Sequence, residues 1–199
     1  MQIQSALDLR RDLSQRLTRQ INALRPIAYD TEAIEYLKEK TSEAVGYALA
    51  VEGPVPENRV RAVPVLPRNC MRPDVCEILS SRSRDKTPTL TSPYFLIDVE
   101  VGIATEGLHW QEALFAIREG FRTPLGAHEI LSLALVSNAD GGRRNYPQPI
   151  ALGSYCPGNE ELTVGIPHDA SREDSIALQV VGDEEDNAHW GFPSCAARI

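Results

Sequence analysis

The segment 92–136 constrains the fold of this chain more than any other stretch. Residues 94–99 place apolar side chains at every second position, which predicts a β-strand. From residue 108 to residue 119 apolar side chains recur at helical spacing, and Gly120 is expected to end that helix. The Thr123–Pro124 pair then predicts the cap and first turn of a second helix that extends to residue 137. This strand–helix–helix unit is the densest apolar segment, so we expect it to form the core.

Within this unit, Leu96 or Ile97, Leu114 and Leu133 are expected to be nearly fully buried. The chain has 199 residues, of which 42% are hydrophobic and 24% charged, a composition that suits one soluble domain.

Two helices are predicted before residue 50. In the first, Leu and Ile side chains repeat every four residues from Leu9 to Ile21, and the helix should stop at Arg25 because Pro26 follows. Asp30 can cap the second. The two helices form a helical hairpin in one interpretation, and the first provides a dimer surface in the other.

The rest of the chain predicts short strands and loops. We expect a strand at 60–65, a helix from Pro73 and an exposed loop at 80–92. Closely spaced strands with short turns then suggest an antiparallel meander, at 149–155, 161–166 and 175–181. The predicted fold is α+β: an N-terminal helical pair (1–50) followed by a mainly antiparallel sheet covered by two helices (51–199), as one compact unit.

Charge and hydropathy exclude several classes of partner. The net charge of −8 argues against a nucleic-acid partner, because phosphate binding needs concentrated positive charge. Basic residues gather between Arg59 and Lys86 and acidic residues between Asp169 and Asp186, and both stretches are interpreted as solvated surface. No apolar run is long enough to span a membrane, and no signal peptide is recognisable. We therefore expect a cytoplasmic protein with four free cysteines.

The C-terminal segment has the highest density of chemically useful side chains. Cys195 and His189 are a candidate nucleophile and base, which would act only if their side chains come within hydrogen-bonding reach. The same segment offers four candidate ligand-binding residues: Asn187, Trp190, Ser194 and Arg198. In the structural alternative, Trp190 fills the core, Cys195 is a small buried side chain, and Arg198 pairs with an acid such as Asp98.

Metal and cofactor sites are not predicted. The four histidines are scattered without metal-ligand spacing, and no phosphate-binding loop or nucleotide fingerprint occurs. A His168–Asp169 pair is a weaker catalytic candidate, because adjacent residues seldom orient each other as an acid and a base do.

Four short motifs occur in the order of a known family. Residues 93–99 with Gly102 resemble the "PYLLxDVxxG" strand of an uncharacterised bacterial family common in actinobacteria, and residues 122–125 resemble its "GRTPLT" segment. Residues 152–154 resemble its "LLGS" strand, and the end of the chain resembles its "W…SCxxR". The resemblance covers about residues 93–199 and departs from the pattern between 160 and 186. It implies a shared fold and no particular activity.

Two function classes follow from the sequence. The favoured one is a non-catalytic binding or accessory protein with a small-molecule pocket or a homodimer face, because no complete catalytic set is recognisable. The alternative is a small enzyme that uses Cys195 and His189 on an anionic substrate, with Arg198 binding the anion.

Overall fold

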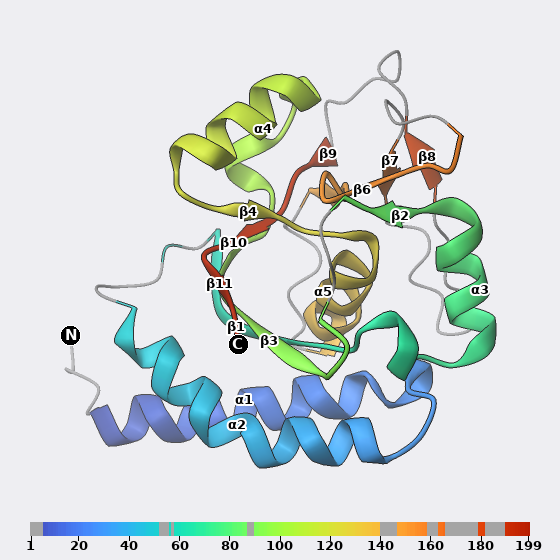
Figure 1. Ribbon diagram of the computed structural model, residues 1–199. Coiled ribbons are helices and arrows are strands. Elements are labelled where there is room, and N and C mark those ends of the chain that lie inside the picture. The colour runs from blue at the N-terminus through green and yellow to red at the C-terminus, as the bar shows by residue number, and fades with distance from the viewer. Residues whose placement is uncertain are drawn as a thin grey trace.

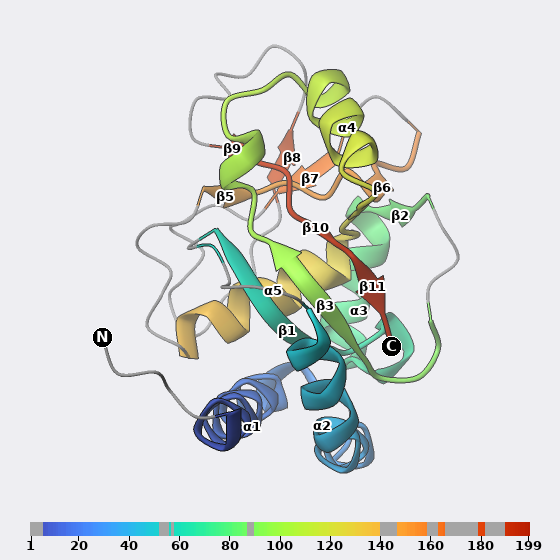
Figure 2. The same ribbon diagram turned by 90° about the vertical axis from the view of Figure 1, so that its left-hand side faces the viewer.

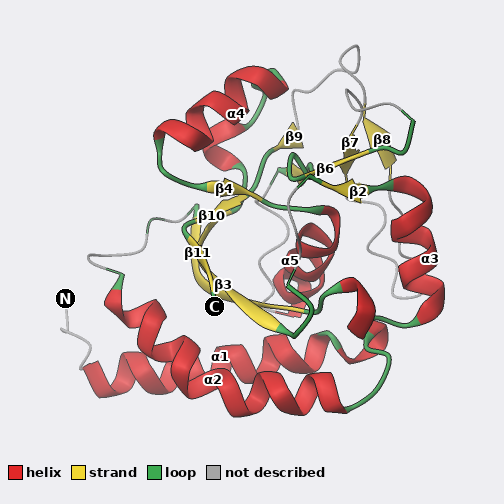
Figure 3. Cartoon of the chain, in the orientation of Figure 1, coloured by secondary structure: helices red, strands yellow, loops and turns green. Residues whose placement is uncertain are grey.

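The structure is an α+β fold, which confirms the class predicted from the sequence (Figures 1 and 3). It is a computed structural model that describes residues 6–51, 56, 58–86, 90–139, 147–158, 163–165, 179–181 and 190–199. Among the described helices, none has both the length and the apolar character that a membrane span requires.

Two helices form the outer layer beneath the sheet, α1 (Ala6–Ala23) and α2 (Glu32–Ala50) (Figure 1). The predicted cap of α2 is confirmed, since Asp30 Oδ1 accepts hydrogen bonds from the backbone amides of Glu32 at 2.9 Å and Ala33 at 3.3 Å. At the other end of α2, Arg61 Nη1 donates to the carbonyl oxygens of Ala48 and Val51. Both ends of the helix are therefore tied by side chains.

The central sheet is built on β3 (Tyr94–Glu100), which is buried along its whole length. It pairs antiparallel with β1 (Arg59–Val65) on one side, and with β10 (Ser194–Cys195) and β11 (Ala197–Arg198) on the other. A short strand, β4 (Thr123–Pro124), extends the sheet beyond β10. The C-terminal segment thus lies beside the strand at the centre of the predicted core (Figure 2).

The main core lies where α5 (Ala127–Ala139), α1 and α2 meet β1 and β3. In Figure 2, α5 lies behind the two strands. Leu96, Ile97 and Leu133 are at most 5% exposed, as predicted. Leu114 is only partly buried, so that prediction was wrong.

The helix that carries Leu114 packs away from the main core. This helix, α4 (Trp110–Glu119), begins at a capping box. The His109 side chain accepts a hydrogen bond from the backbone amide of Glu112, and the Glu112 carboxylate accepts one from the backbone amide of His109. It contacts β4 and lies at the opposite end of the molecule from α1 and α2 (Figure 1). Its buried face joins a separate apolar cluster of Ala113, Ile117, Ile150, Leu152, Trp190 and Phe192. Only α5 of the two predicted helices therefore packs against β1 and β3.

The Thr123–Pro124 pair is a strand, whereas the sequence predicted a helix start. Thr123 pairs with Cys195 and Pro124 with Ser194, so both residues extend the sheet. The helix starts three residues later, where the Glu129 carboxylate accepts a hydrogen bond from the amide of Gly126. Sheet pairing and a cap at a later position outweigh the local preference of proline for a first helical turn.

The remaining elements include α3 (Pro73–Arg82), η1 (Arg25–Ile27), η2 (Arg68–Cys70) and η3 (Ile103–Thr105). The predicted meander is only partly present. An antiparallel pair joins β7 (Thr163–Gly165) to β8 (Gln179–Val181), and an isolated antiparallel bridge joins Ile150 to Gly165. The two short strands that overlap the predicted strand 149–155 pair with other segments. β5 (Gln148–Pro149) runs parallel to β9 (Trp190–Gly191), and β6 (Ser154–Tyr155) pairs with β2 (Arg84–Asp85), inside the predicted loop at 80–92.

Candidate functional site

Titratable side chains from four elements meet at the N-terminal end of α5. Tyr94 comes from β3, Asp85 from β2, His128 and Glu129 from α5, and Arg198 from β11. Tyr94, His128 and Glu129 are at most 3% exposed. Buried polar groups require partners, so the order of hydrogen bonds through this cluster can be followed atom by atom.

The Tyr94 hydroxyl connects the histidine to the glutamate. Its oxygen lies 2.8 Å from Glu129 Oε1 and 2.9 Å from His128 Nε2. A carboxylate can only accept, so the phenol proton points to Glu129 and the tyrosine oxygen accepts the Nε2 proton of His128. Burial and the nearby charge of Glu129 raise the pKa of Tyr94 well above its usual value, which keeps the phenol protonated.

The other ring nitrogen of His128 faces Asp85. Nδ1 is buried and lies 3.8 Å from Asp85 Oδ2, and among the described residues it has no hydrogen-bond partner. The His128 ring therefore lies between the Tyr94 hydroxyl on one side and the Asp85 carboxylate on the other.

Each of these acids also has its own arginine. Arg198 donates to both carboxylate oxygens of Glu129, at 2.7 and 2.8 Å, and also to the carbonyl of Pro124. Burial raises the pKa of Glu129, but the hydrogen bonds and charge of Arg198 outweigh burial and lower it overall. The fork of Arg198, which we predicted would bind an anionic ligand, is thus engaged by a carboxylate of the protein itself.

Asp85 is held in the same way at the other end of the cluster. Arg68 donates to both of its oxygens, at 3.1 and 3.3 Å, and the Ser154 hydroxyl donates at 2.6 Å. Ser154 in turn accepts from the amide of Ala127 in the first turn of α5. Burial raises the pKa of Asp85, but its contacts with His128 and Ser154 and the charge of Arg68 outweigh burial and lower it to about 2.

A second buried ion pair lies where β3 meets β10. Arg122 Nη1 lies 2.6 Å from Asp98 Oδ2, and the same guanidinium donates to the Asp98 carbonyl and to both the hydroxyl and the carbonyl of Ser194. Arg59 contacts the same Asp98 oxygen at 3.1 Å. Asp98 has a left-handed backbone with φ of 51°, which is rare for a residue other than glycine. Arg122 thus stabilises an unfavourable backbone conformation within the central strand.

Those of the predicted C-terminal site residues that the structure describes are used inside the fold. Cys195 is fully buried, and burial raises the pKa of its thiol to about 11, so the thiolate that a nucleophile needs is scarce at neutral pH. Trp190 is 6% exposed and packs in the α4 cluster, away from Cys195. His189 and Asn187 lie outside the described residues, as do His168 and Asp169, and their roles stay predictions.

Two features of the sequence were not recognised as part of this arrangement. Glu129 stands three residues after Gly126, the spacing of a capping glutamate, but nothing local identified Arg198 as its partner. The basic stretch 59–86 was interpreted as solvated surface, yet Arg59 and Arg68 bind the acids described above. Their charges serve internal ion pairs rather than an external anion.

The segments that carry the family resemblance meet in these two ion-pair clusters. Asp98 of the "DV" strand binds Arg122 of the "RTPL" segment, and Arg122 binds Ser194 of the "SC" end. Ser154 of the "GS" strand contacts Asp85 next to α5, and Arg198 closes the same cluster. The motifs are therefore explained by internal contacts that join segments distant in sequence.

A groove between α1 and α2 is separate from both clusters. It has a volume of about 360 Å³ and opens to solvent. Its lining is Arg10, Ser14 and Thr18 from α1, and Lys38, Glu39, Thr41, Ser42 and Val45 from α2. Within the described parts of the chain, no group of three or more His, Cys, Asp or Glu side chains is placed to hold a metal ion.

Comparison with known proteins identifies no relative. No family model, no curated protein and no solved structure matches the chain. The chemistry of the two clusters and of the groove is thus the basis for any functional assignment.

Proposed function

We propose that this is a non-catalytic binding protein that takes a small, hydroxylated anion in the groove between α1 and α2. The observation that carries the proposal is the lining of the groove, which has two cations and four hydroxyl side chains and only one apolar residue, Val45. Most small-molecule pockets are lined mainly by hydrophobic and aromatic side chains, with a few polar groups among them. This lining instead suits a ligand that is polar over most of its surface.

The charge for an anion comes from Arg10 on one helix and Lys38 on the other. Lys38 already lies 2.7 Å from Glu35, but an ammonium has three protons and can keep that contact while donating to a ligand. The two helices differ in charge, because α1 carries four arginines against two aspartates and α2 carries four glutamates against two lysines. The α1 side of the groove therefore provides positive charge that is open to solvent.

The hydroxyl groups define the rest of the ligand. Thr18 donates its proton to the Ser14 carbonyl at 2.9 Å, and Thr41 donates to the Leu37 carbonyl at 3.0 Å. Their oxygens keep lone pairs that can accept from ligand hydroxyls, as can the carboxylate of Glu39. A phosphate ester of a polyol, or a hydroxylated carboxylic acid, offers both the anionic group and the hydroxyl donors.

The groove supports binding rather than catalysis. Its lining contains no histidine or cysteine, and Glu39 is its single carboxylate. A serine nucleophile needs an adjacent base, which is a second reason to favour binding. The alternative of an enzyme built on Cys195 gains no support, because that thiol is buried with a raised pKa.

Calorimetric titration with glycerol 3-phosphate tests the proposal, with inorganic phosphate and glycerol as partial ligands. We expect the ester to bind with a dissociation constant of about 0.1–1 mM and each partial ligand to bind more weakly. Arg10→Gln should weaken binding about tenfold, the effect of losing one charged hydrogen bond. Arg11→Gln is the matched control, since Arg11 is exposed on the same helix but does not line the groove. Equal affinities for the two variants would refute the proposal.

A further inference from the structure

The outer side of α2 carries a line of four exposed side chains: Tyr36, Lys40, Glu43 and Tyr47. Their spacings of four, three and four residues place them on successive turns of one helix face. Tyr36 is 39% and Tyr47 52% exposed, and the side chains of Lys40 and Glu43 are about half exposed. These four residues form the α2 stripe.

The α2 stripe is separate from the surfaces that the fold already uses. It shares no residue with the buried face of α2 or with the groove. Counting about 100° per residue places it on the side of the helix turned away from α1. Figure 2 agrees, showing α1 and α2 side by side with α2 nearer the C-terminus, and none of the labelled helices or strands lies on the far side of α2.

The α2 stripe has a sequence pattern that matches a second, antiparallel copy of itself. Read backwards, the stripe has the same spacings, with the tyrosines exchanged and the lysine and glutamate exchanged. A second α2 running antiparallel across the first would set Tyr36 against Tyr47, and Lys40 against Glu43. A two-fold axis repeats each of these contacts, giving two tyrosine pairs and two ion pairs.

From this pattern we infer that the α2 stripe is a homodimer interface, in which the partner is a second copy of this chain. The argument for this occupant is charge complementarity, because the cation of each copy meets the anion of the other. Tyrosine suits such a contact, since it adds apolar area with little side-chain entropy to lose. The inference does not depend on the proposed ligand groove.

The contact is small, and this sets its strength. The eleven helical steps from Tyr36 to Tyr47 span about 16 Å, so the buried area falls in the class of weak, transient interfaces. We expect a dissociation constant of about 10–100 μM, with monomer and dimer both populated at accessible concentrations.

Sedimentation velocity from 1 to 300 μM tests the inference with two charge reversals. Lys40→Glu alone places a glutamate against Glu43 of the other copy, and Glu43→Lys alone places a lysine against Lys40 of the other copy. Each variant should weaken self-association at least tenfold. An equimolar mixture of the two should associate again, because every position then faces an opposite charge across the two-fold axis.

The mixture separates an interface from an effect on the helix itself. Lys40 and Glu43 also contact each other within one helix at 2.9 Å, and neither variant regains that contact on mixing. Only a contact between chains predicts recovery in the mixture. Phe115→Ala removes a 67% exposed aromatic on α4, at the other end of the molecule, and should leave the association unchanged. Wild-type protein that is monomeric at 300 μM, or variants that associate as the wild type does, would overturn the inference.

Discussion

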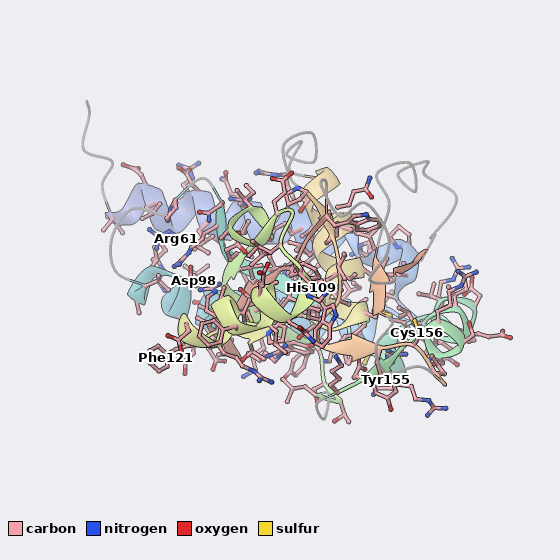
Figure 4. All side chains as sticks on the ribbon, turned by 90° about the horizontal axis from the view of Figure 1, so that it is seen from above. Arg61, Asp98, His109, Phe121, Tyr155 and Cys156 are labelled. Carbon is pink, nitrogen blue, oxygen red and sulfur yellow. The ribbon has the colours of Figure 1, made fainter. Side chains whose placement is uncertain are left out.

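Replacing Phe121 with glycine should stabilise the protein. Phe121 follows the end of α4 in a left-handed conformation with φ of 52°, and its side chain is 95% exposed (Figure 4). Its amide donates to the carbonyl of Arg118, and the amide of Arg122 donates to the carbonyl of Ile117. These two bonds define a Schellman motif, in which the left-handed position is normally a glycine. The glycine of this chain, Gly120, stands one residue too early, with an ordinary φ of −77°.

The expected gain follows from two opposing effects. Relief of the left-handed strain contributes about 1–2 kcal/mol, and the greater freedom of glycine in the unfolded chain removes about 0.5–1 kcal/mol. The lost side chain buries almost nothing, so the net stabilisation should be about 0.5–1 kcal/mol. For a chain of this length the midpoint of thermal unfolding should rise by about 1–4 °C. Adding Gly120→Ala should increase the gain, because a Cβ there would meet its nearest atom at an ordinary 3.5 Å.

Urea unfolding followed by circular dichroism measures this difference. Asp98→Gly is the contrasting variant, because Asp98 has nearly the same φ but its carboxylate pairs with the buried Arg122. That variant should lose about 3–5 kcal/mol, since the arginine is left unpaired. A loss of stability in Phe121→Gly would refute the reasoning. It would show that the exposed ring makes a stabilising contact in solution.

Three further outcomes are expected. Arg198→Ala should destabilise the protein by about 3–5 kcal/mol in urea unfolding, because it leaves the buried carboxylate of Glu129 without its cation. Arg198→Lys keeps a positive charge and should lose less stability. The folded pKa of Asp85 is lowered, so its contribution is present above the unfolded value near 3.8 and is lost as pH falls toward about 2. Asp85→Asn should therefore reduce the drop in unfolding free energy between pH 4 and pH 2 by about 2 kcal/mol. An unfolding free energy that depends on pH as in the wild type would contradict this. Labelling of Cys195 at neutral pH should require unfolding, whereas the partly exposed Cys76 should react in the folded protein.

The sequence was sufficient for elements whose causes lie within a few residues. The four-residue repeat from Leu9 to Ile21 predicted α1, and Asp30 predicted the start of α2. The alternation in 94–99 predicted β3, and the α+β class followed from these elements. Hydrophobic periodicity and caps act over one or two turns or strand steps, so they can be recognised without knowing the fold.

Elements whose causes lie far away in the chain were misassigned. The Thr123–Pro124 pair has local features of a helix start, but its partner strand lies some seventy positions further on, at Ser194 and Cys195. Leu114 follows the helical apolar pattern of α4, yet that helix packs on a cluster at the margin of the molecule. Periodicity predicts which face of a helix is buried, while the depth of burial depends on what packs against it.

The same distinction separates the residues of the predicted site from their roles. The sequence identified Cys195 and Arg198 as chemically capable side chains, and composition alone could go no further. Only the tertiary structure placed Glu129, 69 residues from Arg198 in sequence, within hydrogen-bonding distance of its guanidinium. The same folding removed Cys195 from water. The strength of a charge pair and the pKa of a thiol depend on the groups and the solvent within a few ångströms, and the fold determines which groups those are.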